Sequence, residues 1–183
     1  MLHKPLSKKL RNELMKIIHG AIANMRYAPT IKILESYRRE FIFDDNFLYR
    51  LGLLYDHQAA LVQKTNPQQA DLYLKYACDI YADIVKRNTK NFFALYGLAR
   101  VYAHQGNFKK TIKYAKRAYC EKNKLPFNQK GALPVGGFYE RSGDLKSAER
   151  WYKKELKDLG GNEFGAIMNL LAFYNRTKQV QKA

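Results

Sequence analysis

Residues 91–123 read NFFALYGLARVYAHQGNFKKTIKYAKRAYCEKN. Apolar side chains recur at helical spacing in both halves of this stretch, which predicts two amphipathic helices. Gly106 separates them, because glycine tolerates the positive φ that the chain commonly needs where a helix ends. Helices this short are unstable alone, so we expect them to pack on each other and on neighbours of the same kind.

Similar stretches lie on both sides of this segment. Gly106 has a counterpart at Gly143, and the sequence LGLLYDHQ of Leu51–Gln58 resembles LARVYAHQ of Leu98–Gln105. An insertion near residues 59–70 lengthens the spacing of the second pair. Self-similarity over this distance is typical of helical repeat proteins.

The shared pattern is Leu-Gly or Leu-Ala, an aromatic residue further on, the inter-helix glycine, and then alanine and an aromatic in the second helix. It resembles the tetratricopeptide repeat (TPR) family, and the C-terminal part is also similar to Sel1-like repeats. The resemblance implies an all-α fold, a right-handed superhelical α-solenoid in which the first helix of each unit lines a concave groove. We expect a single domain over residues 1–183 with units at about 12–44, 46–89, 91–123 and 130–158, and a half-unit or capping helix at 163–177.

Three local signals refine this expectation. Tyr27-Ala28-Pro29 predicts a turn between the two helices of the first unit. Asn66-Pro67, inside the insertion, predicts a turn that either follows an extended helix or lies in a projecting loop. Pro134 predicts that the first helix of the fourth unit is short or kinked, since proline disrupts a helix interior.

The chain is strongly basic, and this limits its partners more than its fold. Lys and Arg total 33 against 16 Asp and Glu, which gives a formal charge of +17. Such a charge favours acidic peptides, nucleic acid or an anionic membrane surface, although a solvated exterior also carries charge. No apolar run approaches the roughly 20 residues needed to span a bilayer, and the N-terminus lacks an uninterrupted apolar segment. We therefore expect a cytoplasmic protein without a membrane span.

The sequence contains no motif that indicates catalysis. It has no phosphate-binding glycine loop, no H-E-x-x-H and no cysteine pair at metal-binding spacing. His57 and His104 occupy equivalent repeat positions, where they could hold a metal or simply line the groove. Because no cysteine or carboxylate completes a ligand set, we predict no enzyme, no metal and no cofactor.

The predicted groove mixes basic and aromatic residues. The residues expected to bind a partner there are Tyr49, Arg50, His57, Phe93, Tyr96, Arg100, His104, Lys130, Arg141, Asn169 and Arg176. Arginine binds carboxylates bidentately and tyrosine adds rigid contact area, so the groove predicts a scaffold or adaptor that binds an acidic segment of another protein. For Tyr49 and Phe93, packing between repeats is an equally good interpretation.

A second basic surface is expected outside the groove. It comprises Lys109, Lys110, Lys113, Lys116, Arg117, Lys146, Arg150, Lys153, Lys154 and Lys157. Such a surface could bind phosphates, so the alternative function is RNA or ribosome association. No known nucleic-acid-binding motif accompanies it. A third hypothesis is self-assembly through the last half-unit, and the expected oligomeric state is a monomer or weak homodimer.

Overall fold

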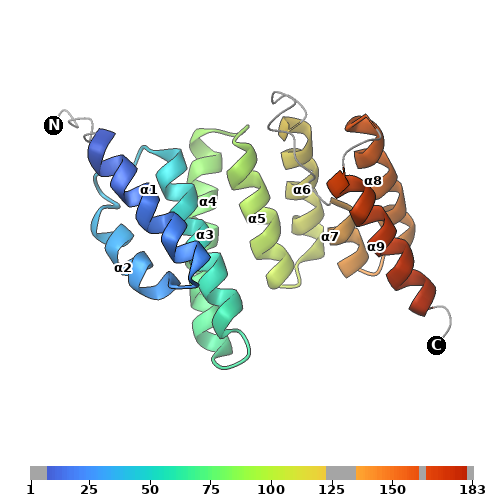
Figure 1. Ribbon diagram of the computed structural model, residues 1–183, viewed down its shortest axis with the longest axis horizontal. Helices are drawn as coiled ribbons and strands as arrows, with labels where there is room; N and C mark the ends of the chain where they lie inside the picture. The colour runs from blue at the N-terminus through green and yellow to red at the C-terminus, as the bar shows by residue number, and fades with distance from the viewer. Residues whose placement is uncertain (1–7, 123–134, 161–163, 181–183) are drawn as a thin grey trace. The chain divides into compact units, whose positions relative to one another are not determined.

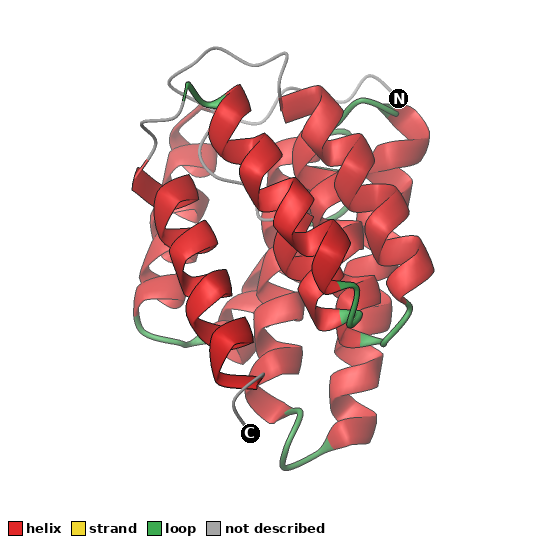
Figure 2. Ribbon diagram, turned by 90° about the vertical axis from the view of Figure 1, so that its right-hand side faces the viewer, coloured by secondary structure: helices red, strands yellow, loops and turns green. Residues whose placement is uncertain are grey.

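The computed structural model describes residues 8–122, 135–160 and 164–180, and these residues are all-helical (Figures 1 and 2). The helices within them are α1 (Lys8–Ala23), α2 (Tyr27–Ser36), α3 (Asp45–Val62), α4 (Pro67–Arg87), α5 (Phe92–His104), α6 (Phe108–Lys122), α7 (Val135–Arg141), α8 (Leu145–Asp158) and α9 (Phe164–Val180). They form two compact units, Met1–Val101 and Tyr102–Ala183.

In the first unit, helices pack mainly on their neighbours in the chain. α1 contacts α2, α2 contacts α3, and α3 forms its most extensive pairing with α4. Apolar side chains at helical spacing supply the core between them. Its largest fully buried members are Ile18, Leu34, Phe47, Leu51, Leu54, Leu74, Ile80, Tyr81, Ile84, Leu95 and Leu98.

Tyr81 of α4 lies against the backbones of two other helices. A Cβ atom at Gly52 of α3 would be 2.7 Å from its ring, and one at Gly97 of α5 would be 2.6 Å away. No larger residue fits at either position unless the ring moves, and the ring is completely buried. The two glycines therefore set how closely α3 and α5 approach Tyr81.

Polar side chains fix the starts of α3 and α4. The Asp44 carboxylate accepts hydrogen bonds from the amides of Asn46 and Phe47, both at 3.0 Å. Asn66 Oδ1 accepts from the Gln69 amide at 3.0 Å, with proline in the first turn. These N-caps satisfy amides that have no partner inside the helix.

The second unit has the same kind of neighbour packing. α6 contacts α7, α7 contacts α8, and α8 contacts α9. A Cβ atom at Gly136 of α7 would be 2.8 Å from the ring of Tyr152 on α8 and 2.9 Å from the Ala148 carbonyl oxygen. Tyr152 packs with Ala148 and Phe173 of α9 in the core. A glycine of one helix thus again faces a tyrosine of the next.

Several local predictions are confirmed. The quoted segment forms α5 and α6, and Gly106 between them has φ of 70°. The equivalent Gly143 has φ of 84°. α7 is short, at seven residues. The insertion near residues 59–70 extends helices instead of forming a projecting loop, since α3 continues to Val62 and α4 begins at Pro67.

The predicted turn at Tyr27–Pro29 is wrong. α2 begins at Tyr27, and the turn lies just before it, where Met25 has φ of 53°. Pro29 lies in the first turn of α2, where the missing N–H has no intrahelical partner to lose.

Within the described residues, no helix combines the length and apolar character needed to cross a membrane.

Candidate binding surfaces

An aromatic surface in the first unit is formed by Tyr49 of α3 and by Phe92, Phe93 and Tyr96 of α5. The Phe93 ring lies 5.2 Å from Tyr49 and 5.0 Å from Phe92, and the Phe92 and Tyr96 rings are parallel at 6.4 Å. Phe93 is 53% exposed although its ring has two aromatic neighbours. These residues offer a continuous apolar contact area on the helices that also pack around Tyr81.

Tyr49 connects this aromatic surface to the core. Its ring lies 5.9 Å from Tyr81 on one side and contacts Phe93 on the other. Burial raises the pKa of its hydroxyl, and the positive charge of Arg100 only partly offsets this. The packing interpretation of Tyr49 therefore agrees with these contacts, while its binding of a partner stays a prediction.

Arg50 follows Tyr49 in α3 and has only weak neutral contacts. Its Nε donates to Asn46 Oδ1 at 3.2 Å, and its Nη1 lies 3.5 Å from His19 Nε2. Among the described residues, no carboxylate pairs with it. Its guanidinium can therefore bind an external carboxylate without breaking an internal ion pair.

Arg100 has a different environment. Its Nη2 lies 2.9 Å from Oδ2 of Asp56, a carboxylate with no exposed side-chain surface, while Arg100 itself is 25% exposed. A buried carboxylate requires a countercharge, so Arg100 serves the fold of the first unit. His57, next to Asp56, stacks on Tyr27 at 5.4 Å. Its pKa is lowered mainly by burial and then by Arg100, with Asp56 opposing both.

The predicted site residues of the second unit are dispersed. Arg176 of α9 donates two hydrogen bonds to the Glu140 carboxylate at 2.7 and 2.9 Å. Arg141 donates to the Ala103 carbonyl at 3.3 Å. His104 is exposed and Asn169 is half-buried. Lys130 lies outside the described residues.

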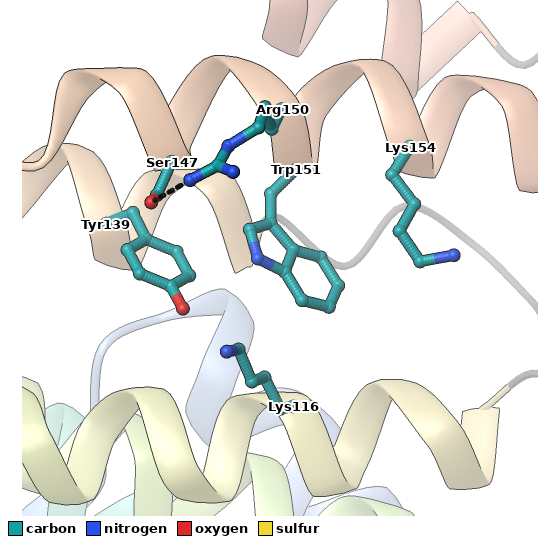
Figure 3. Close-up of a pocket in the computed structure, with 6 residues that line it drawn as sticks. All are labelled: Lys116, Tyr139, Ser147, Arg150, Trp151 and Lys154. Carbon is teal, nitrogen blue, oxygen red and sulfur yellow. Dashed lines mark hydrogen bonds between the residues drawn. The ribbon is translucent and has the colours of Figure 1, made fainter.

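A pocket in the second unit combines cations of the predicted outer basic surface with two aromatic side chains and a serine. This cavity of about 310 Å³, which we call the Trp151 pocket, is lined by Lys116 of α6, Tyr139 of α7, and Ser147, Arg150, Trp151 and Lys154 of α8 (Figure 3). The three cations belong to the predicted outer basic surface. Tyr139 and Trp151 were not predicted as site residues. The available signal was the single tryptophan of the chain, which lies between two of these cations in sequence.

The rings of the Trp151 pocket are held in a fixed arrangement. The ring planes of Tyr139 and Trp151 are nearly parallel, at 17°, and their centroids are 6.4 Å apart. The Trp151 indole also meets the buried Tyr119 ring edge-on at 5.2 Å. Lys116 Nζ lies 5.5 Å from the Tyr139 centroid and 5.8 Å from that of Trp151, within cation–π range.

The polar groups around the Trp151 pocket leave it positively charged. None of the described residues that line it is acidic. Arg150 Nη2 donates to the neutral Ser147 hydroxyl at 3.0 Å, as Figure 3 shows. Lys154 Nζ pairs with Asp158 at 3.0 Å, and the Tyr119 hydroxyl donates to the same carboxylate oxygen at 2.6 Å. Burial acts to raise the pKa of Asp158, but these two hydrogen bonds outweigh it and lower that pKa.

Comparisons with known proteins assign no family to the chain: no protein family model matches it, and no curated protein is significantly similar in sequence. In the described parts of the chain, no group of three or more His, Cys, Asp or Glu side chains is placed to hold a metal ion. The predicted pair of His57 and His104 is divided between the two compact units.

Proposed function

We propose that this chain is a non-catalytic scaffold or adaptor that binds an acidic segment of another protein. The segment binds the aromatic surface, and its carboxylates bind Arg50. The observation that carries the proposal is the half-exposed Phe93, which extends a row of rings from Tyr49. The next residue of α3, Arg50, has no carboxylate partner among the described residues. Exposed aromatic and arginine side chains of this kind dominate the energy of protein interfaces.

The proposal includes a TPR-like repeat organisation, arranged as a right-handed superhelical solenoid. Two features support it. Neighbouring helices pack in chain order within each unit. In two units, a tyrosine of the second helix also lies against a glycine of the first helix, as Tyr81 against Gly52 and as Tyr152 against Gly136. We expect the chain to bind such a partner in the cytoplasm.

Two arginines of the first unit have different roles in this proposal. Arg50 supplies the charge for the partner, while Arg100 balances buried Asp56. An acidic segment gains a charge-assisted hydrogen bond from Arg50 and apolar contact from Phe93 and Tyr96. Such a hydrogen bond contributes about 1.5–3 kcal/mol, and the rings add apolar burial.

A selection from a peptide library tests the proposed ligand chemistry. Random 16-residue peptides are displayed and selected on the full chain, and in parallel on Arg50→Gln and on the control Arg38→Gln. We expect the wild-type chain and the control to enrich peptides with Asp or Glu beside apolar residues, and the Arg50→Gln variant to lose the acidic preference. Enrichment of peptides without acidic residues, or the same acidic preference in Arg50→Gln, contradicts the proposal.

A further inference from the structure

We propose that the Trp151 pocket binds single-stranded nucleic acid, with a base stacked on its aromatic rings and phosphates on its cations. This site lies in the second unit and uses none of the residues of the aromatic surface. The proposal is therefore independent of the function proposed above.

The Trp151 pocket offers a flat aromatic face next to three cations. Tyr139 and Trp151 lie within 17° of parallel, and the edge-on contact with buried Tyr119 fixes the indole. Lys116 covers these rings through a flexible stem, so its ammonium can move to a phosphate while a base takes its place. Base stacking on an aromatic side chain contributes to binding without regard to base identity.

The cations of the Trp151 pocket are available to an anion. Lys116 has only cation–π contacts, and Arg150 donates only to a neutral hydroxyl, among the residues that the structure describes. Lys154 is paired with Asp158, but it is half-exposed. A ligand that carries both an aromatic ring and negative charge satisfies both features of the cavity. An acidic peptide without aromatic residues uses the cations but leaves the ring faces uncovered.

Basic residues continue from the Trp151 pocket along both helices. Exposed cations beyond it include Lys109 and Lys113 on α6 and Lys146, Lys153 and Lys157 on α8, of which Lys153 pairs with Glu149 at 2.7 Å. They recur about one helical turn apart, so they line up along each helix. A small anion needs only the cations of the pocket, whereas a chain of phosphates can bind successive cations on either side. This extended charge favours a polymer over a mononucleotide.

Trp151 provides a direct readout, because it is the only tryptophan in the chain. Its fluorescence is recorded during titration with a 12-residue oligouridylate at about 50 and 200 mM salt, and affinity is measured in parallel by fluorescence anisotropy with a labelled oligomer. We expect quenching and a steep loss of affinity with salt, because binding releases counterions. A poly-glutamate peptide of equal charge should leave the Trp151 emission unchanged.

Two matched double variants locate the site. Lys116→Gln with Arg150→Gln removes two charges from the pocket, and Lys32→Gln with Lys75→Gln removes two exposed charges from the first unit. We expect the pocket variant to lose at least about tenfold in affinity and to reduce the salt slope by about 1.4, at about 0.7 for each lost phosphate contact on a single strand. The control should keep its quenching, and circular dichroism checks that both variants remain helical.

Three results would overturn this inference: equal affinity of the two double variants, binding without quenching, or equal quenching by poly-glutamate. The last result would make the pocket a second site for acidic protein segments. None of these three results affects the peptide selection, which depends on Arg50 and Phe93 in the other unit. The two proposals can therefore fail separately.

Discussion

Single glycines determine how closely helices approach Tyr81. In Gly97→Ala the new methyl group would lie 2.6 Å from a ring that is fully buried and cannot move aside freely. We expect this change to lower the free energy of unfolding by about 1–3 kcal/mol, as overpacking of cores typically does. Urea unfolding followed by circular dichroism measures it.

Gly20→Ala is the matched control, because nothing lies within 4 Å of the added Cβ on α1. Alanine has the higher helix propensity, so this variant should be neutral or stabilised by up to about 1 kcal/mol. Equal free energies of unfolding for the two alanine variants would show that Tyr81 does not constrain the spacing of the helices.

A second residue-scale prediction concerns the ion pair of Arg100 and Asp56. Removing the guanidinium in Arg100→Ala leaves a buried carboxylate without this countercharge. Breaking a fully buried pair costs about 3–5 kcal/mol, and we expect about 2–3 because Arg100 is partly exposed. The control Arg50→Ala should lose less than about 1 kcal/mol, since its contacts are exposed. If thermal unfolding shows equal losses, Arg100 has no special structural role.

At this scale the sequence indicates residue types better than residue roles. Arg50 and Arg100 were both predicted to line the groove, yet one has neutral contacts and the other balances Asp56. The difference depends on a carboxylate from another helix, which one-dimensional spacing does not reveal. Tyr139 and Trp151 were missed for the same reason, because α6, α7 and α8 must pack before the Trp151 pocket exists.

At the scale of elements, the cap of α4 can be tested alone. Asn66→Ala removes the side-chain oxygen that accepts from the Gln69 amide at 3.0 Å. Loss of such a cap costs about 1 kcal/mol. The neighbouring exposed Gln68→Ala should have almost no effect on chemical unfolding. Equal stability of both variants would mean that Pro67 alone is enough to start the helix.

Glu140 links three helices and gives the second unit an acid-sensitive contact. The carboxylate of Glu140 on α7 accepts from Arg176 of α9 at 2.7 Å and from the Tyr152 hydroxyl of α8 at 3.0 Å. The hydrogen bond from Arg176 is the main cause that holds the Glu140 pKa below its usual 4.5. As the pH falls, the Glu140 carboxylate is therefore protonated in the unfolded chain before it is protonated in the folded chain. The contact contributes its full stability above about pH 4.5.

We expect Arg176→Gln to lose about 0.5–1 kcal/mol near neutral pH, a modest value because Arg176 is half-exposed. The difference from wild type should shrink as the pH falls below 4.5 and through the folded-state pKa of Glu140. Thermal unfolding from about pH 7 to pH 3 measures it, with exposed Lys75→Gln as the control. A difference that does not change with pH would exclude Glu140 as its source.

Helix positions were largely predictable from local sequence. Periodic apolar residues, Gly106 and the Asn66-Pro67 pair fixed the limits of α4, α5 and α6 closely. The start of α2 was not predictable in this way, because from sequence alone a proline in the first turn of a helix looks like a proline in a turn. Packing favours the helix over the turn, since Tyr27 and Ile31 bury their side chains on one face of α2.

At the scale of the whole molecule, the excess of positive charge serves two proposed surfaces of different chemistry. The aromatic surface has one arginine beside several rings and suits a segment that is both apolar and acidic. The Trp151 pocket has three cations around two rings and continues into basic rows, which suits a chain of phosphates. The sequence predicted both classes of partner. It did not predict which residues form each surface, because that depends on how the helices pack.

The central claim is that the aromatic surface binds acidic protein segments, and the affinity of Phe93→Ala tests it most directly. The tightest selected acidic peptide is titrated against the wild-type chain, Phe93→Ala and Leu61→Ala by isothermal calorimetry. Phe93 and Leu61 are equally exposed, at 53% each, so truncation of either should barely affect folding. We expect Phe93→Ala to weaken binding by about 2 kcal/mol, roughly thirtyfold, as for an interface hot spot, and Leu61→Ala to bind like wild type. Equal affinity of the two variants would contradict the claim.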